Sequence, residues 1–122
     1  MSKRRILIVE DEAIVALAIR HRLESLGYAV DRTVASGDDA IRSISESQPN
    51  LVLMDIMIDG DMDGIEAAAR IRGEHSVPII YITGNSDPAT LARARATNPQ
   101  AILIKPVVDD DLASTIEGVL AG

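Results

Sequence analysis

The sequence contains no cysteine, no phenylalanine and no tryptophan, and each absence excludes a kind of structure or chemistry. Without cysteine the chain has no disulfide, no thiol catalysis and no thiolate metal site, which agrees with a reducing compartment. Because two tyrosines are its only aromatic residues, the core must be built from aliphatic side chains. Basic residues are also few: 12 against 19 acidic ones give a net charge of −7. Nucleic acids and anionic membranes need a basic surface, so we expect neither as a partner.

The chain also lacks a long apolar run. The apolar residues 6–9 follow a basic start, but the acidic residues 10–12 interrupt them at once, which excludes a signal peptide. No run approaches the length of a membrane span. We therefore expect a cytoplasmic protein. Its 122 residues fit one domain, and about two-thirds of the surface of an unfolded chain of this size can be buried on folding.

Five short apolar runs alternate with helix-length amphipathic segments. This order is typical of a parallel sheet with helices on its faces. The predicted strands are residues 6–9, 28–34 (near an edge, because of its polar interruptions), 51–54, 79–82 and 101–104. The predicted helices are residues 12–26, 36–47, 64–73 and 87–97, and a last one that Asp109 or Asp110 caps.

The run Leu51–Met54 is apolar throughout and is expected to be buried on both faces, with Asp55 directly after it. Ligands of an open parallel sheet bind outside the carboxyl ends of its strands. Polar residues also follow the other predicted strands there: Glu10 and Asp11, Thr83 and Gly84, and Lys105. We expect these side chains to gather around Asp55.

Such a gathering of carboxylates needs a cation. Like charges repel by about 1 kcal/mol per pair at 4 Å in water and by about 4 kcal/mol at an effective dielectric of 20. Mg²⁺ fits best, because one or two carboxylates with water and phosphate oxygens satisfy it. Asp55 can then act as a nucleophile toward phosphorus. Lys105 would offset charge on the transferring group, while Thr83 and the backbone amide of Gly84 would hydrogen-bond its oxygens.

Together these motifs resemble the receiver domain of bacterial two-component response regulators over the whole chain. The matching residues are Glu10-Asp11, Asp55, Met62-Asp63-Gly64, Thr83-Gly84 and Lys105-Pro106. The resemblance implies a flavodoxin-like α/β fold, with a doubly wound, five-stranded parallel sheet in the order 2-1-3-4-5. It also implies one receiver domain over residues 1–122 and a cis peptide bond before Pro106.

The resemblance further implies that Asp55 accepts a phosphoryl group from a sensor histidine kinase or a histidine phosphotransferase. Glu10, Asp11 and Asp55 would hold Mg²⁺ together with the Met57 backbone carbonyl. Thr83 would transmit the signal, and Lys105 would contact the phosphoryl group. The domain would be a signalling phosphoacceptor with slow self-dephosphorylation rather than an enzyme. As a monomer or weak homodimer, it would act on an unknown downstream protein by surface contact, because no output domain fits in this chain.

Two features depart from the family pattern. The loop 55–64 is one residue longer than usual and lacks the usual proline. Ile102 replaces an aromatic residue that the family carries three positions before the lysine. An aliphatic side chain cannot reproduce a ring that swings between exposed and buried rotamers, so the relay from Thr83 to the surface is expected to differ or to be muted. Tyr81 is a candidate to replace the ring.

Two other functions remain open at this stage. A dehalogenase-like phosphatase also uses an aspartate nucleophile with Mg²⁺, but it needs a second acid two residues later, where this chain has Met57. A scaffold that binds partners without being phosphorylated is the other alternative. The acidic loop 59–64 matches half of a calcium-binding loop, but Arg70 stands where a bidentate glutamate is required. These acids are therefore predicted to form turns and helix caps.

Overall fold

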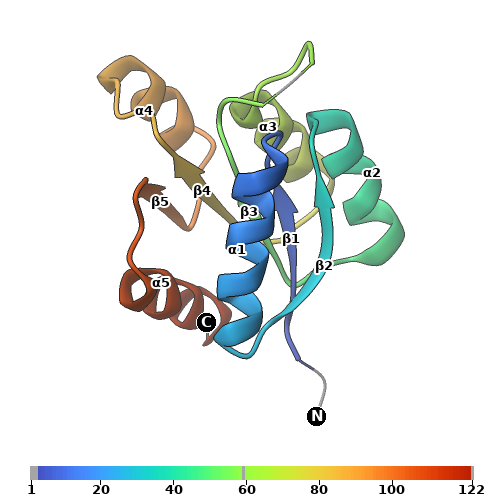
Figure 1. Cartoon of the computed structure of the whole chain (residues 1–122). Coiled ribbons are helices and arrows are strands. Elements are labelled where there is room, and N and C mark those ends of the chain that lie inside the picture. The colour runs from blue at the N-terminus through green and yellow to red at the C-terminus, as the bar shows by residue number, and fades with distance from the viewer. Residues whose placement is uncertain (1–2, 59, 122) are drawn as a thin grey trace.

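A computed structural model describes residues 3–58 and 60–121, in which five strands and five helices alternate (Figure 1). The strands are β1 (Arg5–Val9), β2 (Ala29–Val34), β3 (Leu51–Met54), β4 (Ile79–Thr83) and β5 (Ala101–Ile104). The helices are α1 (Ala13–Ser25), α2 (Gly37–Ser47), α3 (Gly64–Glu74), α4 (Pro88–Arg95) and α5 (Asp109–Ala121). Each predicted element is present close to its predicted bounds.

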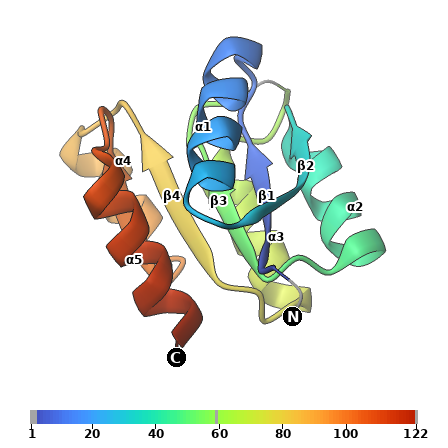
Figure 2. The same cartoon turned by 60° about the horizontal axis from the view of Figure 1, so that its bottom comes forward.

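The strands form one parallel sheet in the order β2-β1-β3-β4-β5, which confirms the predicted topology. Figure 2 shows the arrows of β1, β2 and β4 pointing the same way. Ile8 on β1 pairs with Thr33 on one side and with Leu53 on the other. The first crossover therefore places β2 on one side of β1, and the second places β3 on the other side. Ligands bind at such a switch point, outside the carboxyl ends of the strands.

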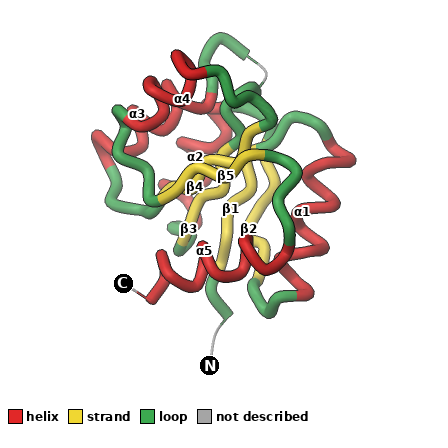
Figure 3. Tube along the Cα trace, turned by 90° about the vertical axis from the view of Figure 1, so that its left-hand side faces the viewer, coloured by secondary structure: helices red, strands yellow, loops and turns green. Residues whose placement is uncertain are grey.

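Side chains alternate across the sheet, so each face has its own aliphatic core. Helices α2, α3 and α4 cover one face, and α1 and α5 cover the other (Figure 3). All four residues of β3 and all five of β4 are buried, whereas β2 and β5 are partly exposed at the two edges. The edge position of β2 is confirmed. The buried middle of the sheet thus carries Asp55.

Local capping explains where three helices begin. The side chains of Ser36, Asp63 and Asp87 each accept a hydrogen bond from the backbone N–H three residues later, at the starts of α2, α3 and α4. The predicted cap of α5 is wrong. That helix already begins at Asp109, so Asp109 and Asp110 both lie in its first turn. Their negative charge there is favourable for the helix dipole, which stabilises the start without a cap from either side chain.

No helix within residues 3–58 and 60–121 combines the length and the apolar character that crossing a membrane requires.

Candidate functional site

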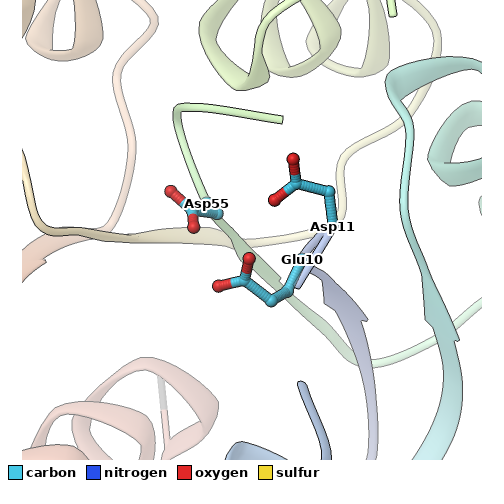
Figure 4. Close-up of side chains that lie close together, drawn as sticks. All are labelled: Glu10, Asp11 and Asp55. Carbon is cyan, nitrogen blue, oxygen red and sulfur yellow. The ribbon is translucent and has the colours of Figure 1, made fainter. Parts of the chain in front are cut away.

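Three acidic side chains meet at the carboxyl ends of two neighbouring strands. Glu10 and Asp11 follow β1, and Asp55 follows β3. Each contributes a carboxylate oxygen to a group in which all these atoms lie within 4.8 Å of one another (Figure 4). Glu10 and Asp55 are buried, with 3% and 8% of their surface exposed, and Asp11 is partly exposed. Charges this close repel strongly at low water content, so the arrangement needs a cation.

Lys105 supplies one cation to this group. Its Nζ lies 2.9 Å from Glu10 Oε1 and 3.0 Å from Asp55 Oδ2. Partial burial lowers the pKa of Lys105, but hydrogen bonds to the two carboxylates and their negative charges outweigh burial, so the pKa of Lys105 is raised. Lys105 therefore stays protonated at neutral pH. The peptide bond from Lys105 to Pro106 is cis, as predicted.

The backbone fixes the two buried carboxylates. The second oxygen of Glu10, Oε2, accepts a hydrogen bond from the Glu12 backbone N–H at 3.1 Å. Asp55 Oδ1 accepts one from the Met57 backbone N–H at 3.2 Å. Each acid thus uses one oxygen for Lys105 and the other for the N–H two residues later. Asp11 differs, because its carboxylate has no hydrogen bond or ion pair with any other described residue.

Thr83 ends β4, the strand that pairs with β3. It is fully buried, and its Oγ1 accepts a hydrogen bond from the Asn85 backbone N–H at 3.1 Å. The hydroxyl proton can therefore be donated to another group. Gly84 is exposed, and no atom lies within 4 Å of the position that a Cβ would take there. Met57, whose backbone carbonyl is a predicted metal ligand, is 61% exposed.

Gly64 shapes the site, and sequence reasoning missed this role. A Cβ on Gly64 would lie 2.1 Å from the Asp55 backbone oxygen and 2.9 Å from the Ile56 Cα. The Gly64 N–H also donates to the Ile56 carbonyl at 2.7 Å. The start of α3 therefore packs directly on the backbone that carries Asp55. Glycine is a poor helix former, and its presence at a helix start is the one sequence signal of this close approach.

The acidic loop before α3 contributes a helix cap. Asp63 caps α3 through the Glu66 N–H and also forms an ion pair with Arg93 on α4 at 3.1 Å. The prediction of a cap is confirmed for this residue. Asp59, the first acid of the calcium-like loop, lies outside the described residues.

Tyr81 lies beside Ile102, its partner in the β4–β5 register. The ring is fully buried, and its hydroxyl lies 2.7 Å from Thr97 Oγ1. Burial raises the pKa of the Tyr81 hydroxyl. The aromatic ring of this region therefore belongs to the core, one strand inward from the sheet edge where Ile102 stands.

A family model described as the response regulator receiver domain matches residues 6–117. The chain belongs to this family. The fold agrees with this assignment, because the signal receiver domain of a modulated diguanylate cyclase from Desulfovibrio desulfuricans G20 superposes with a TM-score of 0.92. That domain is 40% identical, and the match covers 98% of this receiver domain and 95% of that chain.

Curated relatives of this receiver domain include longer proteins. The transcriptional regulatory protein PdtaR of Mycobacterium tuberculosis (strain CDC 1551 / Oshkosh) is 34% identical over 114 residues, which are 93% of this chain and 55% of that protein. The phosphate regulon transcriptional regulatory protein PhoB of Rhizobium meliloti (strain 1021) is 31% identical over 119 residues, which are 95% of this chain and 52% of that protein. This chain therefore spans about half the length of these relatives.

Proposed function

We propose that this receiver domain is the phosphoacceptor of a two-component phosphorelay and that Asp55 takes the phosphoryl group with Mg²⁺ bound. One observation supports this most directly. The Asp55 carboxylate, at the end of the central strand, has Lys105 Nζ at 3.0 Å and oxygens of Glu10 and Asp11 within 4.8 Å. A nucleophile, a fixed cation and a pair of acids able to hold a metal ion therefore share one edge of the sheet.

The donor atoms fit Mg²⁺. The group consists of carboxylates alone, and hard divalent ions prefer oxygen ligands. Glu10, Asp11 and Asp55 would hold the ion, and we propose the Met57 backbone carbonyl as a further ligand. When bound, Mg²⁺ supplies positive charge that offsets the acids and the phosphoryl oxygens. Asp11, which has no partner among the described residues, is the carboxylate that can turn toward an ion without breaking another contact.

The chain's own residues have distinct roles in this proposal. An oxygen of Asp55 forms a bond to phosphorus as the bond between phosphorus and the histidine nitrogen of the donor breaks. The Met57 N–H holds Asp55 Oδ1, which keeps the other oxygen, Oδ2, directed to Lys105. Lys105 neutralises charge that develops on the phosphoryl oxygens, and lysine suits this task as a mobile point charge. The Thr83 hydroxyl and the Gly84 amide would donate to the remaining oxygens.

The proposed donor is a sensor histidine kinase or a histidine phosphotransferase, and the proposed receiver of the signal is a downstream protein in the cytoplasm. We propose that residues 1–122 act as one receiver domain, as a monomer or weak homodimer, without a nucleic-acid or membrane partner of their own. The curated relatives are named as transcriptional regulatory proteins, but this chain covers about half of each. Their output is therefore not assigned to it.

Intact-mass measurement after incubation with Mg²⁺ and acetyl phosphate tests the proposal. We expect one phosphoryl adduct on the wild-type chain and none on Asp55→Asn. Asp61→Asn, which changes an exposed acid of the same loop, is the matched control and should be modified like the wild type. Turnover of phosphomonoesters without a stable adduct would favour the dehalogenase-like alternative. No adduct and no turnover would favour the scaffold.

A further inference from the structure

Arg22 lies on α1, but its guanidinium contacts the chain just after Lys105. Its Nε donates to Asp109 Oδ1 at 2.6 Å, and its Nη2 donates to the Val107 backbone carbonyl. These partners are 87 and 85 residues away in the sequence. One side chain therefore attaches both the loop after β5 and the first turn of α5 to α1.

The loop that Arg22 holds has few other anchors. One backbone hydrogen bond holds each end of the loop. At its start the Lys105 N–H donates to the Thr83 carbonyl at 2.8 Å, and at its end the Leu112 N–H donates to the Val108 carbonyl at 3.0 Å. In the described part of the chain, no side chain except Arg22 hydrogen-bonds to residues 106–108. Val108 is 60% exposed, and every residue of β5 is at least partly exposed. The backbone just after Lys105 is therefore held by few polar contacts.

Apolar packing between α1 and this loop is incomplete. A groove of about 480 Å³ lies between them, and its walls include Ile14, Arg22, Lys105 and Val107. Val107 packs against the apolar cluster that includes Ile19 and Leu23 of α1, and the polar contacts of Arg22 add to this packing in holding the loop. The groove also shows that Arg22 and Lys105 border one continuous space.

The same helix begins beside the acidic group. Its first residue is Ala13, and the Glu12 N–H just before it holds Glu10 Oε2. Arg22 lies within α1, so α1 connects the backbone that orients Glu10 to the loop that carries Lys105. The two ends of this connection are therefore both tied to α1.

We propose that Arg22 is a positioning residue for phosphoryl transfer, which keeps the Lys105 ammonium between Glu10 and Asp55 by attaching the loop after Lys105 to α1. This inference rests on the function proposed above. The Arg22 side chain is 31% exposed and that of Asp109 is 67% exposed, and exposed ion pairs contribute little to stability. Loss of Arg22 should therefore change the reaction more than the fold.

Phosphorylation rates of variants test the inference. At saturating Mg²⁺ and with acetyl phosphate as donor, we expect Arg22→Gln to lower the rate of adduct formation roughly tenfold, because misplacement by a fraction of an ångström weakens a transition-state contact. Asp109→Asn leaves the hydrogen bond from Arg22 to the Val107 carbonyl in place, so it should lower the rate less than Arg22→Gln does. Arg22→Lys keeps the positive charge on a single donor nitrogen and should retain more of the rate than Arg22→Gln. Arg42→Gln, which removes the exposed pair with Asp39 on α2, should match the wild type.

A second measurement reports on Lys105 itself. The sequence contains two lysines, Lys3 and Lys105, so selective ¹³C labelling of lysine gives two side-chain NMR signals. Arg22→Gln should shift or broaden the Lys105 signal and leave the Lys3 signal in place. A purely structural role would instead lower the melting temperature and Mg²⁺ affinity together with the rate.

The outcomes are distinguishable. A folded Arg22→Gln variant with the wild-type rate and an unchanged Lys105 signal would overturn the positioning role, and so would parallel losses of stability and Mg²⁺ affinity. Phosphorylation of the wild type at Asp55 would stand in both cases. Absence of any wild-type adduct would defeat the proposed function instead, and the Lys105 signal would still decide whether Arg22 positions that side chain.

Discussion

Lys105 Nζ lies 3.0 Å from Asp55 Oδ2, across 50 residues of sequence, and the same ammonium also contacts Glu10. The Glu10 side chain is only 1% exposed, so this ammonium takes the place of water beside one of its oxygens. This ion pair joins an edge strand to the middle of the sheet. The stability of the metal-free domain and the proposed phosphorylation of Asp55 should therefore both depend on this one side chain.

Lys105→Gln should affect both properties. The free energy of unfolding without Mg²⁺ should fall by about 1.5–3 kcal/mol, because buried Glu10 loses a charged hydrogen-bond donor. Added Mg²⁺ should restore part of this loss, since it supplies the missing positive charge. The rate of adduct formation with acetyl phosphate should fall about 100-fold. Urea denaturation with and without Mg²⁺ and intact-mass kinetics measure these effects, and Lys3→Gln, on an exposed residue, is the control. Unchanged stability would contradict the importance of the pair.

Mg²⁺ should stabilise the wild-type domain. Binding to the folded state alone adds about 2.7 kcal/mol to the free energy of unfolding when the ion is at 100 times its dissociation constant, and EDTA should remove this gain. Asp11→Asn should abolish most of it, because one of three carboxylates is lost. Asp38→Asn, an exposed acid on α2, should keep the full gain. Equal Mg²⁺ stabilisation of Asp11→Asn and the wild type in thermal unfolding would show that the ion binds elsewhere.

Gly64→Ala should damage the site through the backbone. The new Cβ would stand 2.1 Å from the Asp55 backbone oxygen, so α3 or the β3 end must move. We expect a loss of about 1–3 kcal/mol, the range for overpacking, together with slower phosphorylation. Gly73→Ala is the matched control on the same helix, because its Cβ meets nothing within 4 Å. It should be neutral or stabilising by about 0.4–1 kcal/mol. Similar unfolding midpoints for both variants would refute the close approach.

Tyr81→Phe should weaken the domain by about 0.5–1.5 kcal/mol at neutral pH, because it removes the hydroxyl and with it the 2.7 Å hydrogen bond to Thr97 Oγ1. It should also change the response to alkaline pH. Since burial raises the pKa of Tyr81, the unfolded chain releases this proton first as the pH rises above the usual tyrosine pKa of about 10. The stability linked to Tyr81 is therefore complete below that pH and is lost as the pH rises through the raised value.

Urea denaturation at neutral pH and above pH ~10 measures this difference. The phenylalanine variant should lose less stability over that interval than the wild type. Tyr28→Phe is the control at neutral pH, because the Tyr28 hydroxyl has no hydrogen bond with any described side chain; it is no control at alkaline pH, since burial raises the pKa of Tyr28 as well. An equally steep alkaline loss in Tyr81→Phe and the wild type would show that Tyr81 does not titrate as argued.

Much of the fold follows from local sequence. The runs at residues 51–54 and 79–82 are apolar throughout and became the buried strands β3 and β4. Ser36 and Asp87 mark helix starts because their side chains cap backbone N–H groups within the same turn. The cap predicted for α5 failed because several acids in a row favour a helix start from more than one position. Alternative start positions of a helix differ little in free energy, so a run of similar residues does not determine where the helix begins.

The sequence by itself determined the alternation of strands and helices, the acid after the central strand and the set of polar residues at the other strand ends. These depend on hydrophobic period and on contacts a few residues apart. Only the tertiary structure decided that Lys105 bridges Glu10 and Asp55, that α3 approaches Asp55 too closely for any residue but glycine at position 64, and that Arg22 reaches the loop after Lys105. Such contacts join segments far apart in the chain, and their geometry depends on how the helices pack against the finished sheet.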